Sequence, residues 1–310
     1  MMQLLKPYKS KNWTKRIASK KWVKQIIDKN SKIITPIDCE KYIHKTDKMA
    51  LAALKAIPLF DKACSKILSI ISEPQIHIIN MSSKIRITEN QVPKVYYMVQ
   101  SICNKIGIDI PDLYLELDRS PNAYAFGAEK VSITVHSGLL ECLEDDELYA
   151  VLAHECGHIA CKHMLYHTIG KIILEGEQSG LKKLGLANTI IDDIISMPLK
   201  LAFHHWERCS ELSADRVAVI CCESSTPVIE TMMRLAGGTT HIDSEINTDL
   251  FIDQVAEFQD LTEDNKINKA LEYWLTRNYT HPLLAVRAYN AREWSKSEEF
   301  ADIIKNLGTI

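Results

Sequence analysis

Apolar residues recur at helical spacing along most of the chain, whereas a few short stretches between residues 75 and 135 alternate apolar with polar positions. The helical spacing predicts helices at 48–68, bent near Pro58, and at 92–106, 144–169, 172–223, 226–236, 249–258, 262–278 and 282–306. The alternating stretches predict strands at 75–79, 84–88, 112–117, 122–127 and 131–135. The chain shows no internal repeat and no low-complexity tract, so the pattern predicts one main domain.

The helix predicted at 144–169 carries His154, Glu155 and His158. Four acidic residues stand at its start, where the helix dipole favours negative charge. His154 and His158 are four residues apart, so both imidazoles lie on one helical face and can bind a single metal ion. Glu155 lies about 100° further round the helix, within reach of a water on that metal. The pattern is typical of zinc-assisted hydrolysis.

A catalytic zinc ion usually has three protein ligands, and one known pattern supplies the third from a histidine ten residues after the first. Here Met164 occupies that position and Cys161 occupies the preceding glycine position, so this pattern fails. His163 and His167 lie on the same predicted helix but out of register with the face of His154. They are therefore predicted to be surface or core residues.

A later helix offers a glutamate as the third ligand. Glu211 and Asp215 are four residues apart on one face, so Glu211 can bind the metal while Asp215 accepts the remaining N–H of a ligating histidine. Glu207 lies on the same face and is the rival ligand. His204 and His205, at the start of this helix, are further candidates that the spacing alone leaves open.

The two strands predicted at 122–127 and 131–135 come directly before the helix with the histidines. A strand exposed at the sheet edge beside the metal would bind a peptide main chain by adding it as a further strand. The alternative is an ordinary edge strand of a mixed sheet, and periodicity does not separate the two.

Composition narrows the class of protein. The chain has 310 residues, of which 46% are hydrophobic and 25% charged, as in an ordinary globular protein. A net charge of -3 argues against a dedicated nucleic-acid binder. Residues 1–35 nevertheless hold ten basic residues against one acidic residue, so residues 1–45 are predicted to be a basic extension before a domain at 46–310. The extension would suit an anionic membrane surface or an acidic partner, although a solvated surface segment is the interpretation we favour.

Nine cysteines, an odd number without a CxxC pair, do not fit a secreted disulfide framework. No secretory signal and no run of 18 or more apolar residues is visible, since the apolar stretch at 184–203 carries Asp192, Asp193 and Lys200. These observations predict a cytoplasmic protein with reduced thiols, at most peripheral to a membrane.

Several of these residues also carry a resemblance to a known family. The HExGH sequence at 154–158, followed by Glu211 with Ala214 and Asp215, resembles the HtpX and CAAX prenyl endopeptidase type 1 family of zinc peptidases. Four further segments resemble family motifs in family order, over roughly residues 46 to 295. They are Asn122-Ala123-Tyr124-Ala125, Ser137-Gly138-Leu139-Leu140, Asp145-Asp146-Glu147-Leu148, and His281-Pro282 with Arg287.

The resemblance implies a zincin-like α+β fold, mostly helical, with a small mixed sheet whose edge strand borders the metal site. It implies one Zn²⁺ per chain, held by His154, His158 and Glu211, because only Glu211 has the Ala-Asp pair at the right distance. This is the ligand set of the gluzincins, which combine HExxH with a downstream glutamate. The resemblance also implies endopeptidase activity on proteins, with residues 122–125 binding the substrate. Integral members carry membrane spans beside the metal helices, and the charged segment at 184–203 departs from them, which favours the soluble branch of the family.

The predicted mechanism is hydrolysis of a peptide bond by a metal-activated water. Glu155 takes the proton of the water and delivers it to the leaving amine. His281 or Arg287 hydrogen-bonds the oxyanion, although an HP pair also starts helices and Arg287 also suits a structural ion pair. Tyr124 is a weaker candidate for approaching the substrate.

Two other classes of protein remain as alternatives. The first is a catalytically silent binding or chaperone-like protein of the same fold that keeps its zinc, and the intact Glu155 argues against it. The second is a hydrolase of another kind that uses HExxH, such as a deformylase-like or small-peptide enzyme. Glu211, Asp215 and the predicted peptide-binding strand argue against that class.

Overall fold

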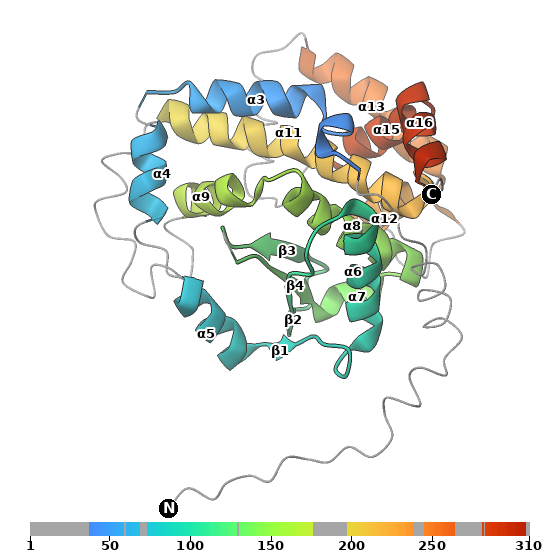
Figure 1. Ribbon diagram of the computed structural model, residues 1–310. Helices are drawn as coiled ribbons and strands as arrows, with labels where there is room; N and C mark the ends of the chain where they lie inside the picture. Colours follow the sequence, from blue (N-terminus) through green and yellow to red (C-terminus); the bar gives the residue numbers. More distant parts are fainter. Residues whose placement is uncertain are drawn as a thin grey trace, which may run out of the picture.

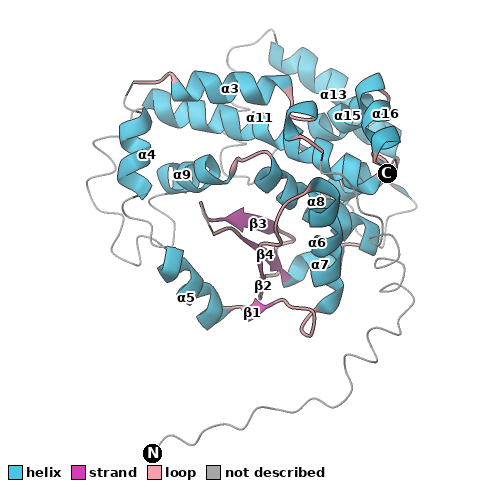
Figure 2. Ribbon diagram, in the orientation of Figure 1, coloured by secondary structure: helices cyan, strands magenta, loops and turns pink. Residues whose placement is uncertain are grey.

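The computed structural model describes residues 37–58, 60–68, 73–128, 130–175, 197–237, 245–263, 281 and 283–307. Most of these residues are helical, and four strands form one small sheet (Figures 1 and 2). The predicted α+β class is therefore confirmed. The strands are β1 (Ile85–Arg86), β2 (Asp112–Glu116), β3 (Ala123–Phe126) and β4 (Ser132–His136).

The helices of the described segments follow the chain in an order that brings two of them to the centre of the molecule. They are a 3-10 turn (Cys39–Lys41), α3 (Lys45–Lys55), α4 (Phe60–Leu68), α5 (Glu73–Ser83), α6 (Pro93–Ile106), α7 (Ser137–Cys142), α8 (Asp145–Ala160), α9 (Met164–Glu175), α11 (Met197–Cys222), α12 (Thr226–Ala236), α13 (Thr248–Glu263), α15 (Leu284–Ser295) and α16 (Glu298–Asn306). Helix α8 packs against α11 on one side and against β3 on another (Figure 1).

The sheet is mixed, as predicted. Its strand order is β1-β2-β4-β3, with β2 and β4 parallel and the other two pairs antiparallel. Every residue of β4 is buried, which suits its central position. Strand β3 pairs with β4 through Tyr124 opposite Thr134, and it forms one edge of the described sheet. This edge faces α8.

The start of α8 is fixed by its acidic residues. The side chain of Glu144 caps the N-terminal turn, and the Glu144 amide donates to Glu147 Oε2 at 2.8 Å, so the two residues form a reciprocal capping box. Glu147 is itself buried and receives Arg234 Nε of α12 at 2.8 Å. The predicted acidic helix start therefore also anchors α12 to α8.

Helices α8 and α11 approach each other at two small residues. A Cβ atom added to Gly157 would lie 3.0 Å from both the Cα and the carbonyl oxygen of Ala214, and 3.0 Å from Cβ of Val217. Gly157 therefore allows the two helices to be closer than a larger residue would. This close crossing sets the distance between the functional residues that the two helices carry.

Apolar side chains gather in two clusters. The larger cluster lies between the sheet, α6, α8, α12 and the second half of α11, and includes Val99, Ile133, Leu152 and Ile220. The smaller one joins α3, α4, α9 and the first half of α11, and includes Leu54, Phe60, Ile169, Phe203 and Trp206. Helix α8 is thus packed within the larger cluster, and α11 runs through both clusters.

The prediction of a single helix at 144–169 is wrong, because the structure has two helices over this range. Helix α8 ends at Ala160, and α9 begins at Met164. Lys162 adopts a left-handed backbone conformation with φ of 61°, which ends the α-helical path. Neither proline nor glycine marks this break, so the apolar spacing gave no sign of it. Because of this break, the His163 side chain points in a different direction from the one it would have on a continuous helix.

Two other predictions are corrected. The range 75–79, predicted as a strand from its alternation, lies in helix α5, because a short apolar run fits either period. The helix predicted at 282–306 is two helices, α15 and α16, since the Ser297 hydroxyl caps a new helix by accepting from the Phe300 amide at 3.2 Å.

Other predicted elements agree with the structure or lie outside the described residues. The predicted helix at 48–68 is divided near Pro58 into α3 and α4, and those at 92–106 and 226–236 correspond to α6 and α12. Residues 1–36, 176–196 and 264–280 are outside the described residues, so the basic extension and the predicted helix at 262–278 are largely untested. The domain boundary at residue 45 stays a prediction.

The close helix crossing leads to a stability prediction for Gly157→Ala. The new methyl group meets backbone atoms of Ala214 that cannot rotate away, so we expect an overpacking cost of about 1–3 kcal/mol. This should exceed the roughly 1 kcal/mol that alanine gains in helix propensity. Urea unfolding of the metal-free protein measures the difference. Gly170→Ala is the control, because its Cβ would meet only side-chain atoms of Glu207 and Phe203. Equal stability of both variants would contradict the constraint.

Candidate metal centre

The centre is built on one face of α8. His154 and His158 lie one turn apart with ring centroids 4.8 Å from each other, and their Nε2 atoms are 3.2 Å apart. Both side chains are buried, as is Glu155. The two imidazoles therefore present nitrogen atoms to one point, as the four-residue spacing predicts.

Helix α11 brings a carboxylate to the same point. Glu211 Oε1 lies 3.2 Å from His158 Nε2, and Glu211 Oε2 lies 3.4 Å from His154 Nε2. Ligand atoms of His154, His158, Glu211 and His281 all lie within 4.8 Å of one another, so this group could hold a metal ion. Nitrogen and carboxylate donors on two helices are the set that zinc prefers.

The rival candidates from the sequence lie elsewhere. Glu207 is one turn before Glu211, and its Oε2 atom is 3.6 Å from His204 Nδ1. The His205 ring is 3.8 Å from the sulfur of Cys209 on the same helix. None of these three residues belongs to the group around His154.

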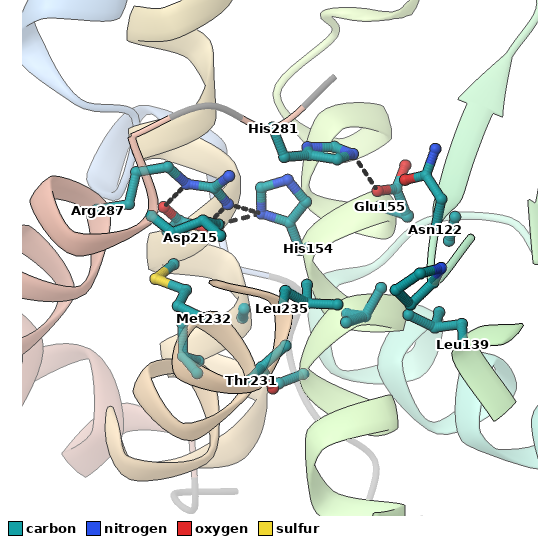
Figure 3. A pocket seen from close by; sticks show the side chains of 17 residues that line it. Asn122, Leu139, His154, Glu155, Asp215, Thr231, Met232, Leu235, His281 and Arg287 are labelled. Atoms are coloured by element: carbon teal, nitrogen blue, oxygen red, sulfur yellow. Dashed lines mark hydrogen bonds and ion pairs between the residues drawn. The ribbon is translucent and has the colours of Figure 1, made fainter. Parts of the chain in front are cut away.

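A second layer of charged side chains surrounds the centre. Asp215 Oδ1 lies 2.9 Å from His154 Nδ1, the nitrogen that faces away from the centre. Arg287 of α15 donates from Nε and Nη2 to Asp215 at 2.8 and 2.6 Å (Figure 3). Its Nη1 atom lies 2.8 Å from Glu211 Oε2. All of these side chains are buried. Arg287 therefore balances two buried carboxylates that would otherwise repel each other.

His281 is the most exposed member of the group. Its Nδ1 atom lies 2.8 Å from Glu211 Oε2. Its Nε2 atom lies 3.6 Å from Glu155 Oε1 (Figure 3). The His281 side chain is 23% exposed, against 2% for Glu155. His281 thus faces both the centre and solvent.

Burial and neighbouring charge shift the pKa values of these groups in different directions. Burial lowers the pKa of His158 to about 3. Burial also acts against a charged His154, but the carboxylates of Glu211 and Asp215 prevail and raise the pKa of His154 to about 9. The pKa of Glu211 lies well below its usual range, because His281, Arg287 and His154 outweigh its burial. Without a metal, the extra proton of the centre resides on His154.

Glu155 differs from the other carboxylates. Burial raises its pKa, although the charges of His281 and His154 and the backbone amide of Ala125 oppose the rise. Its Oε1 atom is buried and makes no hydrogen bond to any described residue. A buried oxygen without a partner is costly unless a ligand or water completes it. The Oε1 atom of Glu155 can therefore accept a hydrogen bond from a bound ligand or water.

The edge strand β3 contributes backbone groups rather than a large side chain. The His136 amide donates to the Asn122 carbonyl at 2.9 Å, and Tyr124 pairs with Thr134, so the backbone groups of Ala123 and Ala125 face away from β4. Asn122 lies beside Glu155 in Figure 3.

The Tyr124 side chain is not brought to the centre. Its hydroxyl accepts from Lys84 at 2.8 Å and donates to Glu116 at 3.2 Å. These partners hold it among neighbours outside the metal group. Of the four predicted substrate-binding residues, Asn122 and Ala123 line the adjoining cavity and Ala125 reaches Glu155 through its backbone.

A cavity of about 50 Å³ opens beside His154 and Glu155. Below these polar groups its wall is largely apolar, and the side chains come from α7, α8, α11, α12 and α15 (Figure 3). The apolar lining includes Leu139, Val151, Val228, Met232, Leu235 and Leu284. The cavity can accept an apolar side chain next to the reactive groups.

Sequence reasoning missed one neighbour of the centre. His163 was predicted as a surface or core residue, and it is buried with its Nδ1 atom 3.1 Å from His158 Nδ1. Helical register could not reveal this contact, because it arises from the break at Lys162. Asp47, far away in the sequence, lies behind His163.

Comparison with known families identifies this arrangement. A family model described as Peptidase family M48 matches residues 89–295, a range that includes every residue of the metal group. The chain belongs to peptidase family M48. The resemblance drawn from the motifs is thus confirmed, and the protein is a metallopeptidase by family.

Individual relatives of the chain also carry the names of metallopeptidases or proteases. The chain is 29% identical over 273 residues to the plastoglobule-localized metallopeptidase 48, chloroplastic, of Arabidopsis thaliana, covering 87% of this chain and 76% of the relative. A protease HtpX homolog of Gemmatimonas aurantiaca is 26% identical over 181 residues, covering 52% of this chain and 63% of that protein. One of Tropheryma whipplei is 37% identical over 81 residues, covering 26% and 28%. The match thus spans less than two thirds of these two HtpX homologues, and no solved structure matches the chain.

In the part of the chain that the structure describes, no helix combines the length and apolar character needed to cross a bilayer. The segment 184–203, on which the expectation of the soluble branch of the family rests, lies mostly outside the described residues, so that expectation stays a prediction.

The raised pKa of His154 predicts a pH effect on the metal-free protein. An unfolded histidine titrates near 6.5, whereas folded His154 keeps its proton to about 9, so the folded state binds more protons between these values. The free energy of unfolding should therefore fall as the pH rises from 6.5 to 9. Urea unfolding in the presence of a chelator measures it at both ends of this range. His154→Gln should flatten the fall, and a rise in stability over this range would contradict the assignment.

Proposed function

We propose that this M48 metallopeptidase is a zinc-dependent endopeptidase, with one Zn²⁺ per chain held by His154, His158 and Glu211. The observation that carries the proposal is the convergence of two Nε2 atoms and one carboxylate beside the unpartnered Oε1 of Glu155. Two imidazoles and a carboxylate are a donor set that suits zinc. Asp215 is placed to accept the Nδ1 hydrogen of His154 and so to orient this imidazole. The chemistry that zinc supplies there is Lewis acidity toward water and toward a carbonyl oxygen.

Glu155 is the general base in this proposal. Its Oε1 atom accepts the proton of the attacking water and then gives it to the nitrogen of the leaving amine. Burial supports this role, because the raised pKa of Glu155 makes the carboxylate a stronger base than an exposed glutamate. The backbone amide of Ala125 acts in the opposite direction and limits this rise in pKa.

His281 and Arg287 have separate roles in this proposal. His281 is partly exposed, and its Nε2 atom lies near Glu155, so it suits a hydrogen bond to the oxyanion that forms on the substrate. The donors of Arg287 already face Asp215 and Glu211. We therefore assign the oxyanion to His281, and to Arg287 the neutralisation and orientation of these two carboxylates.

The substrate is an extended segment of a protein or peptide in this proposal. The outward backbone groups of Ala123 and Ala125 suit the addition of a strand to the edge of β3. Beyond them, Gly127 is closed to a substrate, because the Thr168 hydroxyl accepts from its amide at 3.2 Å and donates to its carbonyl at 3.0 Å. The apolar cavity next to Glu155 supports a preference for an apolar side chain beside the cleaved bond.

The proposal also covers the extent of the peptidase domain and the cellular compartment of the protein. We assign the peptidase domain to residues 46–310, with residues 1–45 as an extension of separate function. All nine cysteines are free in the structure, which supports a reducing compartment such as the cytoplasm.

The first test separates the peptidase from a catalytically silent zinc protein. Glu155→Gln removes the base but none of the proposed ligands, so we expect it to keep one zinc per chain and to lose hydrolysis by at least about a hundredfold. Metal analysis and a cleavage profile on a denatured proteome measure both effects. If the variant cleaves as fast as wild type, Glu155 is not the base. If wild type binds zinc but cleaves nothing, the silent alternative is correct.

The second test concerns the third ligand. Glu211→Ala should weaken zinc binding by more than the roughly 10–100-fold that loss of an outer partner causes, because it removes a direct donor. Glu207→Ala is a matched control one turn earlier on α11, and it should keep wild-type affinity. Competition with a chromogenic chelator measures both variants. Retained affinity in Glu211→Ala together with loss in Glu207→Ala would transfer the ligand role to Glu207.

A further inference from the structure

A line of buried polar side chains leads away from the metal group behind His158. His158 Nδ1 lies 3.1 Å from His163 Nδ1, and His163 Nε2 lies 2.9 Å from Asp47 Oδ2. The three residues are 4%, 2% and 1% exposed. Asp47 is in α3, which precedes the residues that the M48 family model matches. A helix outside the matched range thus reaches the proposed zinc ligand through one imidazole.

The polarity of this line follows from the zinc-binding role proposed for His158. If Nε2 of His158 binds the metal through its lone pair, Nδ1 must carry the hydrogen. His163 Nδ1 must then accept that hydrogen, so His163 carries its own hydrogen on Nε2 and donates it to Asp47. Each nitrogen along the line has a defined role, and no donor faces another donor.

Asp47 is built to receive this hydrogen bond. Besides His163, it accepts from Trp206 Nε1 at 3.0 Å and from Ser213 Oγ at 2.6 Å. Burial acts to raise the pKa of Asp47, but the hydrogen bonds from His163, Ser213 and Trp206 outweigh it and hold the pKa below its usual range. Asp47 therefore carries a negative charge at neutral pH.

The turn between α8 and α9 makes the contact between the two histidines. Lys162 takes the left-handed conformation, and the His163 amide donates to the His158 carbonyl at 3.0 Å. On a continuous helix, His163 would lie about 140° away from His158, because five residues turn the helix by about 500°. The break instead turns the His163 ring back toward His158.

We propose that His163 and Asp47 form a relay that positions His158 and fixes its tautomer for zinc binding. The relay rests on the ligand set proposed above and extends it to α3. His154 has a carboxylate directly behind it in Asp215, and His158 has one behind an intervening imidazole in Asp47. Both imidazoles are thus hydrogen-bonded on the far side from the metal, which raises their strength as ligands.

The same histidines also suggest a different arrangement. Ligand atoms of His158, His163 and His167 lie within 4.8 Å of one another, so they could hold a second metal ion. The Nε2 atom of His167 lies 2.9 Å from Ser210 Oγ, and that of His163 faces Asp47. The relay uses the short Nδ1–Nδ1 contact as a hydrogen bond, whereas a second metal would need both of these atoms as ligands. The number of metal ions per chain distinguishes the two.

The experiment measures zinc affinity of the full-length metal-free protein by competition with a chromogenic chelator. His163→Leu removes the acceptor for His158, and Asp47→Asn removes the charge at the end of the relay. We expect each to weaken zinc binding by roughly 10–100-fold, the usual effect of losing an outer partner of a ligand. His163→Asn keeps an oxygen where Nδ1 lies, so it should recover part of the affinity lost in His163→Leu.

Trp206→Phe is the matched control. It removes another buried hydrogen bond to Asp47 but leaves the line through His163 intact, so it should lower the urea unfolding midpoint and leave zinc affinity within about twofold. A merely structural role of the network would instead reduce stability in all variants and affinity in none. If Asp47→Asn does not fold, the zinc affinities of His163→Leu and His163→Asn still show whether His158 needs an acceptor at Nδ1.

If wild type binds zinc, three outcomes overturn the relay. Wild-type affinity in folded His163→Leu would show that His158 needs no partner at Nδ1. Equal losses in His163→Leu and His163→Asn would show that the acceptor is irrelevant. Saturation of wild type by two zinc ions, with the second lost in His163→Leu, would assign these histidines to a second metal. If wild type binds no zinc, the proposed function fails and the relay fails with it. If wild type binds one zinc ion and only the variant results fail, the proposed function stands.

Discussion

The close approach of α8 and α11 is the constraint on which the centre depends. Gly157 stands directly before His158, and Ala214 stands directly before Asp215, so the tightest point of the crossing lies within the site itself. Packed helices are usually 8–10 Å apart, depending on the side chains at the contact. Larger side chains here would move Glu211 away from both imidazoles by a distance comparable to a metal–ligand bond. Two small residues therefore set the geometry that the proposed metal ligands require.

This geometry places opposite charges where water does not reach them. Glu211 and Asp215 are buried next to each other, and the compensating charges are Arg287 and the proton on His154. An unpaired buried carboxylate would cost several kcal/mol, so removing either positive group would disturb the whole cluster. A divalent metal ion in place of this proton would add one further positive charge, and the buried carboxylate of Glu155 lies beside it to balance that charge. The side chains are thus arranged for a cation before one binds.

The sequence predicted the local chemistry of the centre better than its surroundings. The four-residue spacings of His154 with His158 and of Glu211 with Asp215 fix a helical face, and the structure has both pairs on such faces. Spacing alone could not choose between Glu211 and Glu207, because both lie on that face and only the motif distinguished them. Nor could it show the turn at Lys162, where neither proline nor glycine marks the end of α8. His163 was missed for this reason, and Asp47 was missed because it lies 116 residues away from His163 in the sequence.

In the proposed peptidase, the edge of β3 would connect substrate binding to the base in a way that sequence patterns do not encode. The Ala125 amide faces away from β4, and it acts to lower the pKa of Glu155. A substrate strand that paired with this amide would compete with the Glu155 carboxylate for the same N–H. The pKa of Glu155 would then rise further, so the carboxylate would become a stronger base as the strand binds. Thr168 closes Gly127 further along, which leaves Ala123 and Ala125 as the outward pairing positions of β3 beside the centre. Binding of an extended chain and activation of the base would then be coupled through a single backbone amide.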